Sequence, residues 1–221
     1  MPTKTKIETK APPEAPPDCP LCPRLVAYRE ANARAEPTWF NGAAPSFGDP
    51  DARLLIVGLA PGRTGANRTG RPFTGDYAGD LLYGTLKKLQ LAEGEYRADP
   101  NDGFTLKGAM ITNAVRCAPP ENKPTPAEIA TCRPFLSART QALPNLRAIM
   151  ALGSIAHESV LRAHGLKPTA AKFGHGVETA LPGGAWLVSS YHCSRYNTQT
   201  RRLTAEMFEA VMARAKQLAF A

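Results

Sequence analysis

Four short runs of apolar residues divide the chain, and each has the length of one buried strand. They cover residues 53–58, 109–115, 148–152 and 186–189. Continuous apolar runs of this length are typical of strands that are buried on both faces of a parallel sheet. A ligand of such a sheet binds beyond the carboxyl ends of its strands, so the loops after Gly58, Thr112, Gly153 and Ser190 are the first candidates for a site.

Stretches with helical spacing alternate with these runs. The sequence Thr125-Pro126-Ala127-Glu128 is a capping box with proline at the first helical position, and it predicts a helix start. Pro134 lies inside that helix and predicts a kink or a break. Strand–helix alternation of this kind favours an α/β fold, a three-layer α/β/α sandwich with a central four-stranded parallel sheet. The predicted helices cover residues 19–36, 77–91, 126–142, 154–164 and 204–219.

The charge and the N-terminus narrow the class of protein. The chain has 221 residues, with 27 Lys and Arg against 19 Asp and Glu, which gives a net charge of +8. A basic excess favours a polyanionic partner, although in many basic proteins the charge serves only to keep the protein soluble. No apolar stretch approaches the roughly 20 residues of a membrane span. Residues 1–17, rich in Pro, Lys, Thr and Glu, predict a disordered leader before a single domain over residues 18–221.

Four cysteines form a second candidate site. Cys19 and Cys22 are three positions apart, and Cys117 and Cys132 follow much later. The absence of a secretory signal indicates an intracellular protein, in which disulfides are rare, so four thiols favour zinc or an iron–sulfur cluster. The alternative is that some are inert core cysteines. Cys193 lies in a different loop and is not counted as a ligand.

The loop after the first predicted strand is rich in glycine and arginine. It has neither the Gly-Lys-Ser/Thr of a phosphate-binding P-loop nor a Gly-x-Gly-x-x-Gly pattern. Phe73 is either a platform for base stacking or a ring packed under the loop. Asp76 precedes the helix of residues 77–91, so it is either a helix N-cap or a catalytic carboxylate.

The loop after the fourth predicted strand gathers polar and aromatic side chains. It contains His192, Arg195, Tyr196, Asn197 and Gln199 within eight positions. A cluster of this kind at the carboxyl edge of a sheet is typical of a functional site, although an ordinary solvated loop is the alternative. The other histidines, His157, His164 and His175, have no comparable neighbours in sequence and are expected to be surface or satisfied histidines.

The motifs taken together resemble the uracil-DNA glycosylase superfamily, and within it the type-B branch, family 5. The resemblance spans roughly residue 19 to the end of the chain. The related type-A branch has an acidic residue where Leu59 stands, and family 5 would have proline at the position of Cys193 and glutamine at that of Tyr196. The matching motifs are Gly58-Leu-Ala-Pro-Gly62, residues 67–76, Thr112-Asn-Ala-Val-Arg-Cys117, residues 191–200 and the four cysteines.

The resemblance implies a role for each motif residue. Asn113 would hydrogen-bond the Watson–Crick edge of a flipped base, Phe73 would stack on it, and His192 would donate to the departing base. Asp76 would stabilise the cationic sugar or position water. The backbone of Gly58, Leu59 and Ala60 would approach the substrate. The expected DNA contacts are Arg63, Asn67, Arg68, Arg195, Tyr196 and Asn197, and the expected ligands of a [4Fe–4S] cluster are Cys19, Cys22, Cys117 and Cys132.

The implied activity is excision of uracil, hypoxanthine and xanthine from DNA by hydrolysis of the N-glycosidic bond. Extruding the base costs a few kcal/mol, least where the base is mispaired. We expect double- and single-stranded DNA with damaged bases as partner, no membrane, a monomer, and a cytoplasmic, nucleoid-associated location in a prokaryote. The alternatives are a non-catalytic or altered-specificity nucleic-acid-binding protein of the same fold and an α/β enzyme that binds free nucleotides.

Overall fold

The fold is built on one mixed sheet, in a computed structural model that describes residues 12–221. Four parallel strands form its centre in the order β5-β2-β6-β8, and short antiparallel strands flank them on both edges. The four central strands are β2 (Leu54–Gly58), β5 (Ala109–Asn113), β6 (Ala148–Leu152) and β8 (Trp186–Ser190). The edge strands are β1 (Phe47–Gly48) and β7 (Glu178–Ala180).

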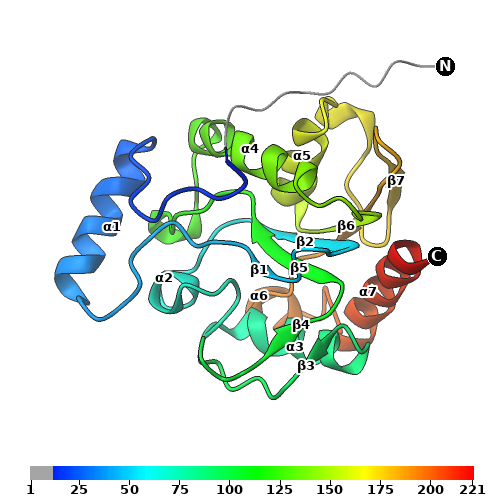
Figure 1. Ribbon diagram of the computed structural model, residues 1–221, viewed down its shortest axis with the longest axis horizontal. Helices are drawn as coiled ribbons and strands as arrows, with labels where there is room; N and C mark the ends of the chain where they lie inside the picture. The colour runs from blue at the N-terminus through cyan, green and yellow to red at the C-terminus, as the bar shows by residue number, and fades with distance from the viewer. Residues whose placement is uncertain (1–11) are drawn as a thin grey trace.

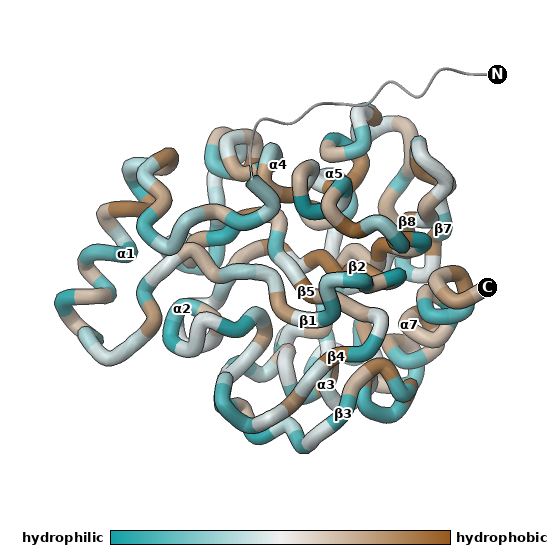
Figure 2. Tube along the Cα trace, in the orientation of Figure 1, coloured by the Kyte–Doolittle hydropathy of each residue, from teal (hydrophilic) through white to brown (hydrophobic). Residues whose placement is uncertain are grey.

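Helices cover both faces of the sheet, as Figure 1 shows, with α4 and α5 on one side and α3 and α7 on the other. Side chains alternate between the two cores, because successive residues of a strand point to opposite faces. Ile56 and Met150 belong to the core under α3 and α7, whereas Leu55 and Ile149 belong to the core under α4 and α5. In Figure 2 the central strands carry brown, hydrophobic segments. The four helices are α3 (Tyr77–Lys88), α4 (Pro126–Gln141), α5 (Ser154–Ala163) and α7 (Ala205–Phe220).

The remaining elements extend this three-layer body. Helix α1 (Pro23–Ala35) lies at one end of the molecule, at the left of Figure 1. A small hairpin of β3 (Ala92–Glu93) and β4 (Thr105–Leu106) lies between α3 and β5 in sequence. The short helices are α2 (Ala66–Thr69), α6 (Arg195–Gln199), η1 (Pro120–Asn122) and η2 (Pro168–Ala170).

The α/β/α sandwich and its four parallel strands are confirmed, but the sheet has six strands and not four. The two additional strands are only two and three residues long and are not fully buried, so no apolar run marks them. The capping box at Thr125 is present, with Glu128 bonded back to the Thr125 backbone. The predicted break at Pro134 is wrong, because α4 continues through it as one helix.

The first helix begins later than its spacing predicts. It starts at Pro23, since proline is favoured in the first turn, and Cys19 to Cys22 form the segment that leads into it. Within the described residues no helix is long and apolar enough to cross a membrane. The predicted leader falls largely on residues 1–11, outside the described part. Glu14, within the predicted leader of residues 1–17, forms ion pairs with Arg116 and Arg139 of the domain.

Candidate active site

A pocket of about 550 Å³ opens at the carboxyl edge of the sheet. The strand order reverses at β2, with β5 on one side of it and β6 on the other, and ligands of open α/β sheets bind at such a point. Of the predicted residues, the structure brings eight to the pocket wall. They are Leu59, Ala60, Arg63, Phe73, Asp76, Asn113, His192 and Arg195.

Asp76 is both an N-cap and a pocket residue, so its two predicted roles are compatible. Its Oδ1 accepts a hydrogen bond from the Gly79 backbone N–H at 3.1 Å, which caps α3. Its Oδ2 faces the glycine-rich loop, where a Cβ on Gly65 would lie 2.6 Å from it. Burial raises the pKa of Asp76, although the N–H groups of Gly79 and Ala78 act in the opposite direction. The carboxylate therefore has one fixed oxygen and one oxygen near the pocket.

Asn113 and Phe73 meet above Gly58 at the end of β2. Gly58 pairs with Asn113 across the parallel ladder, and a Cβ at Gly58 would lie 2.4 Å from Asn113 Oδ1 and 2.6 Å from the Phe73 ring. Only glycine therefore fits at this position. Asn113 Oδ1 is buried and has no hydrogen-bond partner among the described residues. A buried amide oxygen without a partner is costly, so it is a natural contact for the polar edge of a bound base.

His192 lies opposite, in the loop after β8. Its ring is nearly parallel to that of Phe73, with centroids 6.0 Å apart and planes at 27°. Burial lowers the pKa of His192 to about 4, so the imidazole is neutral near pH 7. A neutral imidazole can still donate one N–H. The Asn197 side chain donates to the His192 carbonyl at 2.8 Å and so supports the loop from behind.

The side chains predicted to contact DNA differ in their exposure to solvent. Tyr196 is 71% exposed and Arg195 is exposed beside it, stacked over the Tyr77 ring at 5.1 Å. Arg63 lines the pocket but donates to Asn32 of α1. Asn67, by contrast, is 1% exposed and donates to Asn41 Oδ1, so its geometry is that of a structural residue.

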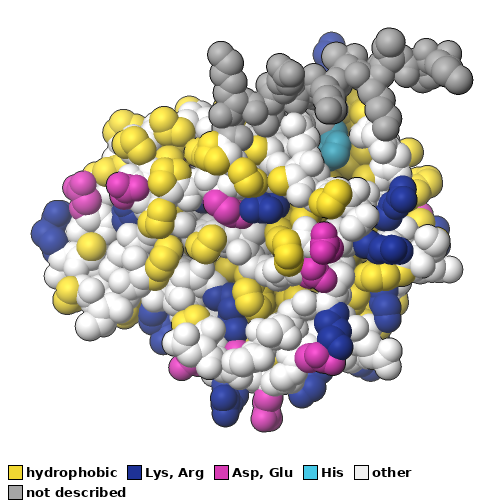
Figure 3. Space-filling model, viewed as in Figure 1, with side chains coloured by type: hydrophobic (Ala, Val, Ile, Leu, Met, Phe, Trp, Pro, Cys, Tyr) yellow, Lys and Arg dark blue, Asp and Glu magenta, His cyan; other side chains and the backbone are white. Residues whose placement is uncertain are grey.

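Arg68 is the remaining predicted contact of the first loop. Its Nε donates to the Thr64 carbonyl at 2.8 Å, and its side chain is exposed. On the face shown in Figure 3 basic and acidic side chains are interspersed. That view therefore does not single out one basic surface for DNA.

The four predicted metal ligands come together beside the pocket. Cys19, Cys117 and Cys132 are buried in one small core, and Cys22 packs against it. The segment before α1, the loop after β5 and helix α4 each contribute to this core. Burial raises the pKa of the Cys117 thiol to about 11 and that of Cys132 to about 12. Cys193 lies elsewhere, buried against the Ala78 carbonyl, as its exclusion from the ligand set predicts.

Donors surround these sulfurs. The Arg116 backbone N–H donates to Cys132 Sγ at 3.3 Å, and Arg29 Nη1 approaches Cys117 Sγ at 3.9 Å. Hydrogen bonds to sulfur stabilise the thiolate form that metal binding requires. Among the described residues, no three His, Cys, Asp or Glu side chains have the spacing for a single metal ion. Four cysteine sulfurs in one buried core, two of them with N–H donors, are a donor set of the kind that binds an iron–sulfur cluster.

Comparison with known proteins identifies the family. The model of the uracil DNA glycosylase superfamily matches residues 45–216. This chain belongs to that superfamily. A type-5 uracil-DNA glycosylase of Thermus thermophilus is 50% identical over 207 residues, covering 91% of this chain and 94% of the relative. The type-5 enzyme of Mycobacterium bovis is 44% identical and covers 91% of this chain and 78% of its own length.

A type-4 relative in the superfamily is more distant. The type-4 uracil-DNA glycosylase of Pyrobaculum aerophilum is 32% identical over 153 residues, which is 69% of this chain and 64% of that protein. The type-5 enzyme of the same organism is 40% identical and covers 90% of this chain. The order of identity agrees with the family-5 motifs in this sequence.

The pocket of this superfamily member also has a wall that the motifs do not mark. Tyr28 of α1 lines it, together with Pro119, Glu121 and Asn122 of the segment after β5. Glu121 and Asn122 both have positive φ, at 54° and 57°. Pro119 and Pro120, with Asn122 two positions after them, are a turn signal in the sequence. Tyr28 gives no such signal, because only the packing of α1 on the domain brings it here.

Proposed function

We propose that this protein is a monofunctional DNA glycosylase. It would flip uracil, and also hypoxanthine and xanthine, out of DNA and hydrolyse the N-glycosidic bond to leave an abasic site. The observation that carries the proposal is the convergence of Asn113, Phe73, His192 and Asp76 on one pocket of about 550 Å³. A base inside a duplex cannot reach such a pocket, so the base must leave the stack first.

The four side chains supply what the reaction needs. The Asn113 amide, whose oxygen has no partner among the described residues, bonds the Watson–Crick edge of the base, and the Phe73 ring stacks on its face. As the bond to the sugar breaks, negative charge develops on the base, and the neutral His192 imidazole donates an N–H to it. The sugar becomes cationic, and the Asp76 carboxylate in the pocket wall stabilises that charge or holds the attacking water.

The DNA backbone would be held by the rim of the pocket. Arg63 and Arg195 line the pocket, and Arg68 on α2 and Tyr196 on α6 are exposed. Arginine side chains bind phosphates by displacing counterions, so affinity should fall as salt rises. Asn197 acts behind the His192 loop through its bond to the His192 carbonyl.

We also propose that Cys19, Cys22, Cys117 and Cys132 hold a [4Fe–4S] cluster. The shared buried core and the N–H donors at two sulfurs support it. Such a cluster would join the start of α1 to α4 and to the segment after β5, as a structural link. The purified protein should be brown, with iron and sulfide in matching amounts. Zinc without iron would refute the cluster.

End-labelled duplexes that carry one uracil, hypoxanthine or xanthine test the activity. After incubation with the protein, alkali cleaves DNA at abasic sites, and a gel resolves the product. We expect cleavage at the lesion only after alkali, from a protein with no lyase activity. Cleavage without alkali would contradict a monofunctional enzyme. Salt-dependent binding without any cleavage would favour the non-catalytic alternative.

A further inference from the structure

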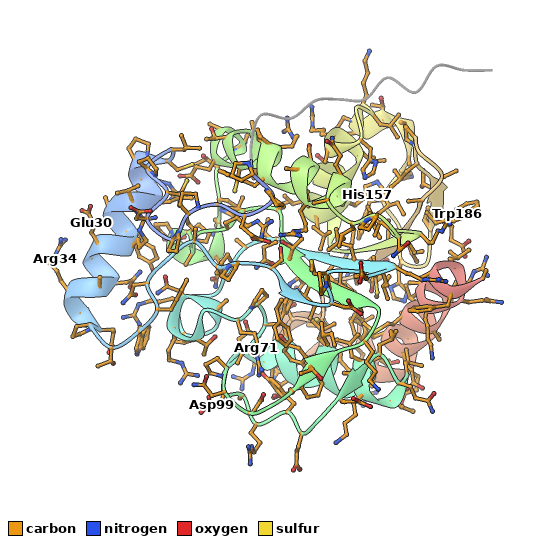
Figure 4. All side chains as sticks on the ribbon, in the orientation of Figure 1. Glu30, Arg34, Arg71, Asp99, His157 and Trp186 are labelled. Carbon is orange, nitrogen blue, oxygen red and sulfur yellow. The ribbon has the colours of Figure 1, made fainter. Side chains whose placement is uncertain are left out.

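A buried ion pair lies directly behind the pocket loop. Arg71 donates through both terminal nitrogens to the two oxygens of Asp102, each at 2.8 Å, and both side chains are buried. The guanidinium lies over the rings of Phe47, Tyr83 and Tyr96, at 5.1 to 5.7 Å. Figure 4 shows Arg71 in the interior, on the side of the sheet that carries the β3–β4 hairpin. A buried pair is tolerated only when its remaining polar groups are satisfied.

Those remaining groups are satisfied by two backbone N–H groups and by a threonine hydroxyl. Asp102 also accepts from the N–H groups of Arg97 and Phe104, at 2.9 and 3.0 Å. Arg71 Nε donates to Thr74 Oγ1 at 2.7 Å. The pair therefore connects the loop after β2 to the segment that joins β3 to β4.

Two tyrosine hydroxyls hold the same loop from the same side. Tyr83 donates to the Pro72 carbonyl at 2.5 Å. The Tyr96 hydroxyl donates to the Phe73 carbonyl at 3.2 Å and accepts from the Gly75 N–H at 3.3 Å. With the bond to Thr74, four consecutive residues, 72–75, each have a polar group held by this network.

The loop needs such support because of its conformation. Phe73 has φ of 56°, a left-handed value that is rare and costly for a residue with a large side chain. With this backbone conformation the Phe73 ring lines the pocket. Asp76, three residues later, is the N-cap of α3. The Phe73 carbonyl also packs so tightly on α3 that a Cβ at Gly79 would lie 1.8 Å from it.

We propose that Tyr96 and the Arg71–Asp102 pair are positioning residues for the reaction. They hold the Phe73 ring and the Asp76 carboxylate where both can contact the flipped nucleotide. The inference rests on the proposed glycosylase function. None of the three side chains lines the pocket, so they act only through the loop. Displacement of a reacting group by about 1 Å can cost roughly 100-fold in rate.

Tyr96→Phe is the test, because it removes one hydroxyl and keeps the aromatic packing on Tyr83 and Phe104. Ser137→Ala is the matched control. It removes one hydroxyl, which donates from α4 to the Ala163 carbonyl at 3.2 Å, and Ser137 does not line the pocket. Each variant is purified as the full chain, and single-turnover excision, affinity for the lesion duplex and thermal unfolding are measured.

We expect Tyr96→Phe to lower the single-turnover rate about tenfold while the Kd for the duplex changes less than about twofold, since phosphate contacts dominate affinity. Ser137→Ala should lose similar stability at an unchanged rate. In a Phe73→Ala background, Tyr96→Phe should cost less, because the part of its effect that acts through the Phe73 ring is already lost.

Three results would overturn the inference. A Tyr96→Phe rate within twofold of wild type would do so, and so would full additivity with Phe73→Ala. A wild-type protein that leaves all three lesions intact would overturn the proposed function and this inference together. The first two results, obtained with an active wild type, would overturn the inference alone.

Discussion

Two loops at the same edge of the sheet are built in opposite ways. The loop after β2 is held from within, since residues 72–75 all bond to buried or half-buried side chains and Phe73 is only 6% exposed. The loop after β8 begins at the pocket with His192 and continues to the surface, where Tyr196 is 71% exposed. The first loop is therefore a fixed platform, and the second joins a pocket residue to a surface that DNA can reach.

This difference predicts that changes in the loop after β2 act on the chemical step. Changes at the exposed residues after β8, Arg195 and Tyr196, should act on DNA binding instead. Asp76→Asn should have the largest effect, a fall in turnover of about 10³-fold, as for an electrostatic or acid–base group. The amide retains an oxygen that can cap α3, so the unfolding midpoint should move little. Single-turnover kinetics and thermal unfolding check both parts. An Asp76→Asn variant with full rate would remove the carboxylate from the mechanism.

His192→Ala should lower the single-turnover rate by about 10²-fold, the usual cost of one hydrogen-bond donor at developing negative charge. Asn197→Ala is the comparison, because it removes only the support to the His192 carbonyl. Its effect should be smaller. If His192→Ala keeps a near-normal rate, the imidazole does not assist departure of the base.

Gly65→Ala tests the position of the Asp76 carboxylate without changing Asp76 itself. The new Cβ would lie 2.6 Å from Asp76 Oδ2, so the carboxylate must move. We expect a loss of up to about 10²-fold in rate. Gly84→Ala on α3 is the control, because a Cβ there meets nothing within 4 Å. Equal rates for the two variants would show that the position of Oδ2 does not matter.

Tyr196→Ala should have a smaller effect, on binding more than on chemistry. Its ring contributes no buried contact to the fold, so we expect a weakening of duplex binding by a few-fold, comparable to the loss of one stacking contact. Titrations at several salt concentrations separate this loss from that of Arg195→Ala, which should also flatten the salt dependence. A Tyr196→Ala variant that binds normally but reacts about 100-fold more slowly would show that Tyr196 acts on the chemical step and not on binding.

The pH profile should show the smallest change. The pKa of His192 is lowered to about 4 by burial, so its neutral form persists as pH falls through the ordinary histidine value of about 6.5. The single-turnover rate should therefore show no inflection there. Stability should decline between about pH 6.5 and 4, since the unfolded state binds the proton more readily. An inflection in rate near the ordinary histidine pKa that disappears in His192→Ala would contradict a neutral donor.

Much of the site could be predicted from sequence because its residues lie at the ends of strands. Asn113 follows an apolar run, Asp76 precedes an amphipathic helix, and His192 comes directly after β8. The capping box at Thr125 and the grouping of four cysteines are likewise local or compositional signals. The edge strands β1 and β7 could not be predicted, because they are short and carry no apolar run.

The sequence by itself determined the α/β/α class, the parallel centre of the sheet and the loops that hold the candidate chemistry. These follow from hydrophobic spacing and local capping, which depend on neighbouring residues. Only the tertiary structure decided that Tyr28 faces the pocket, that Asn67 is buried and that Arg71 pairs with Asp102. Each of these depends on contacts between segments far apart in the chain, whose packing and desolvation no local pattern records.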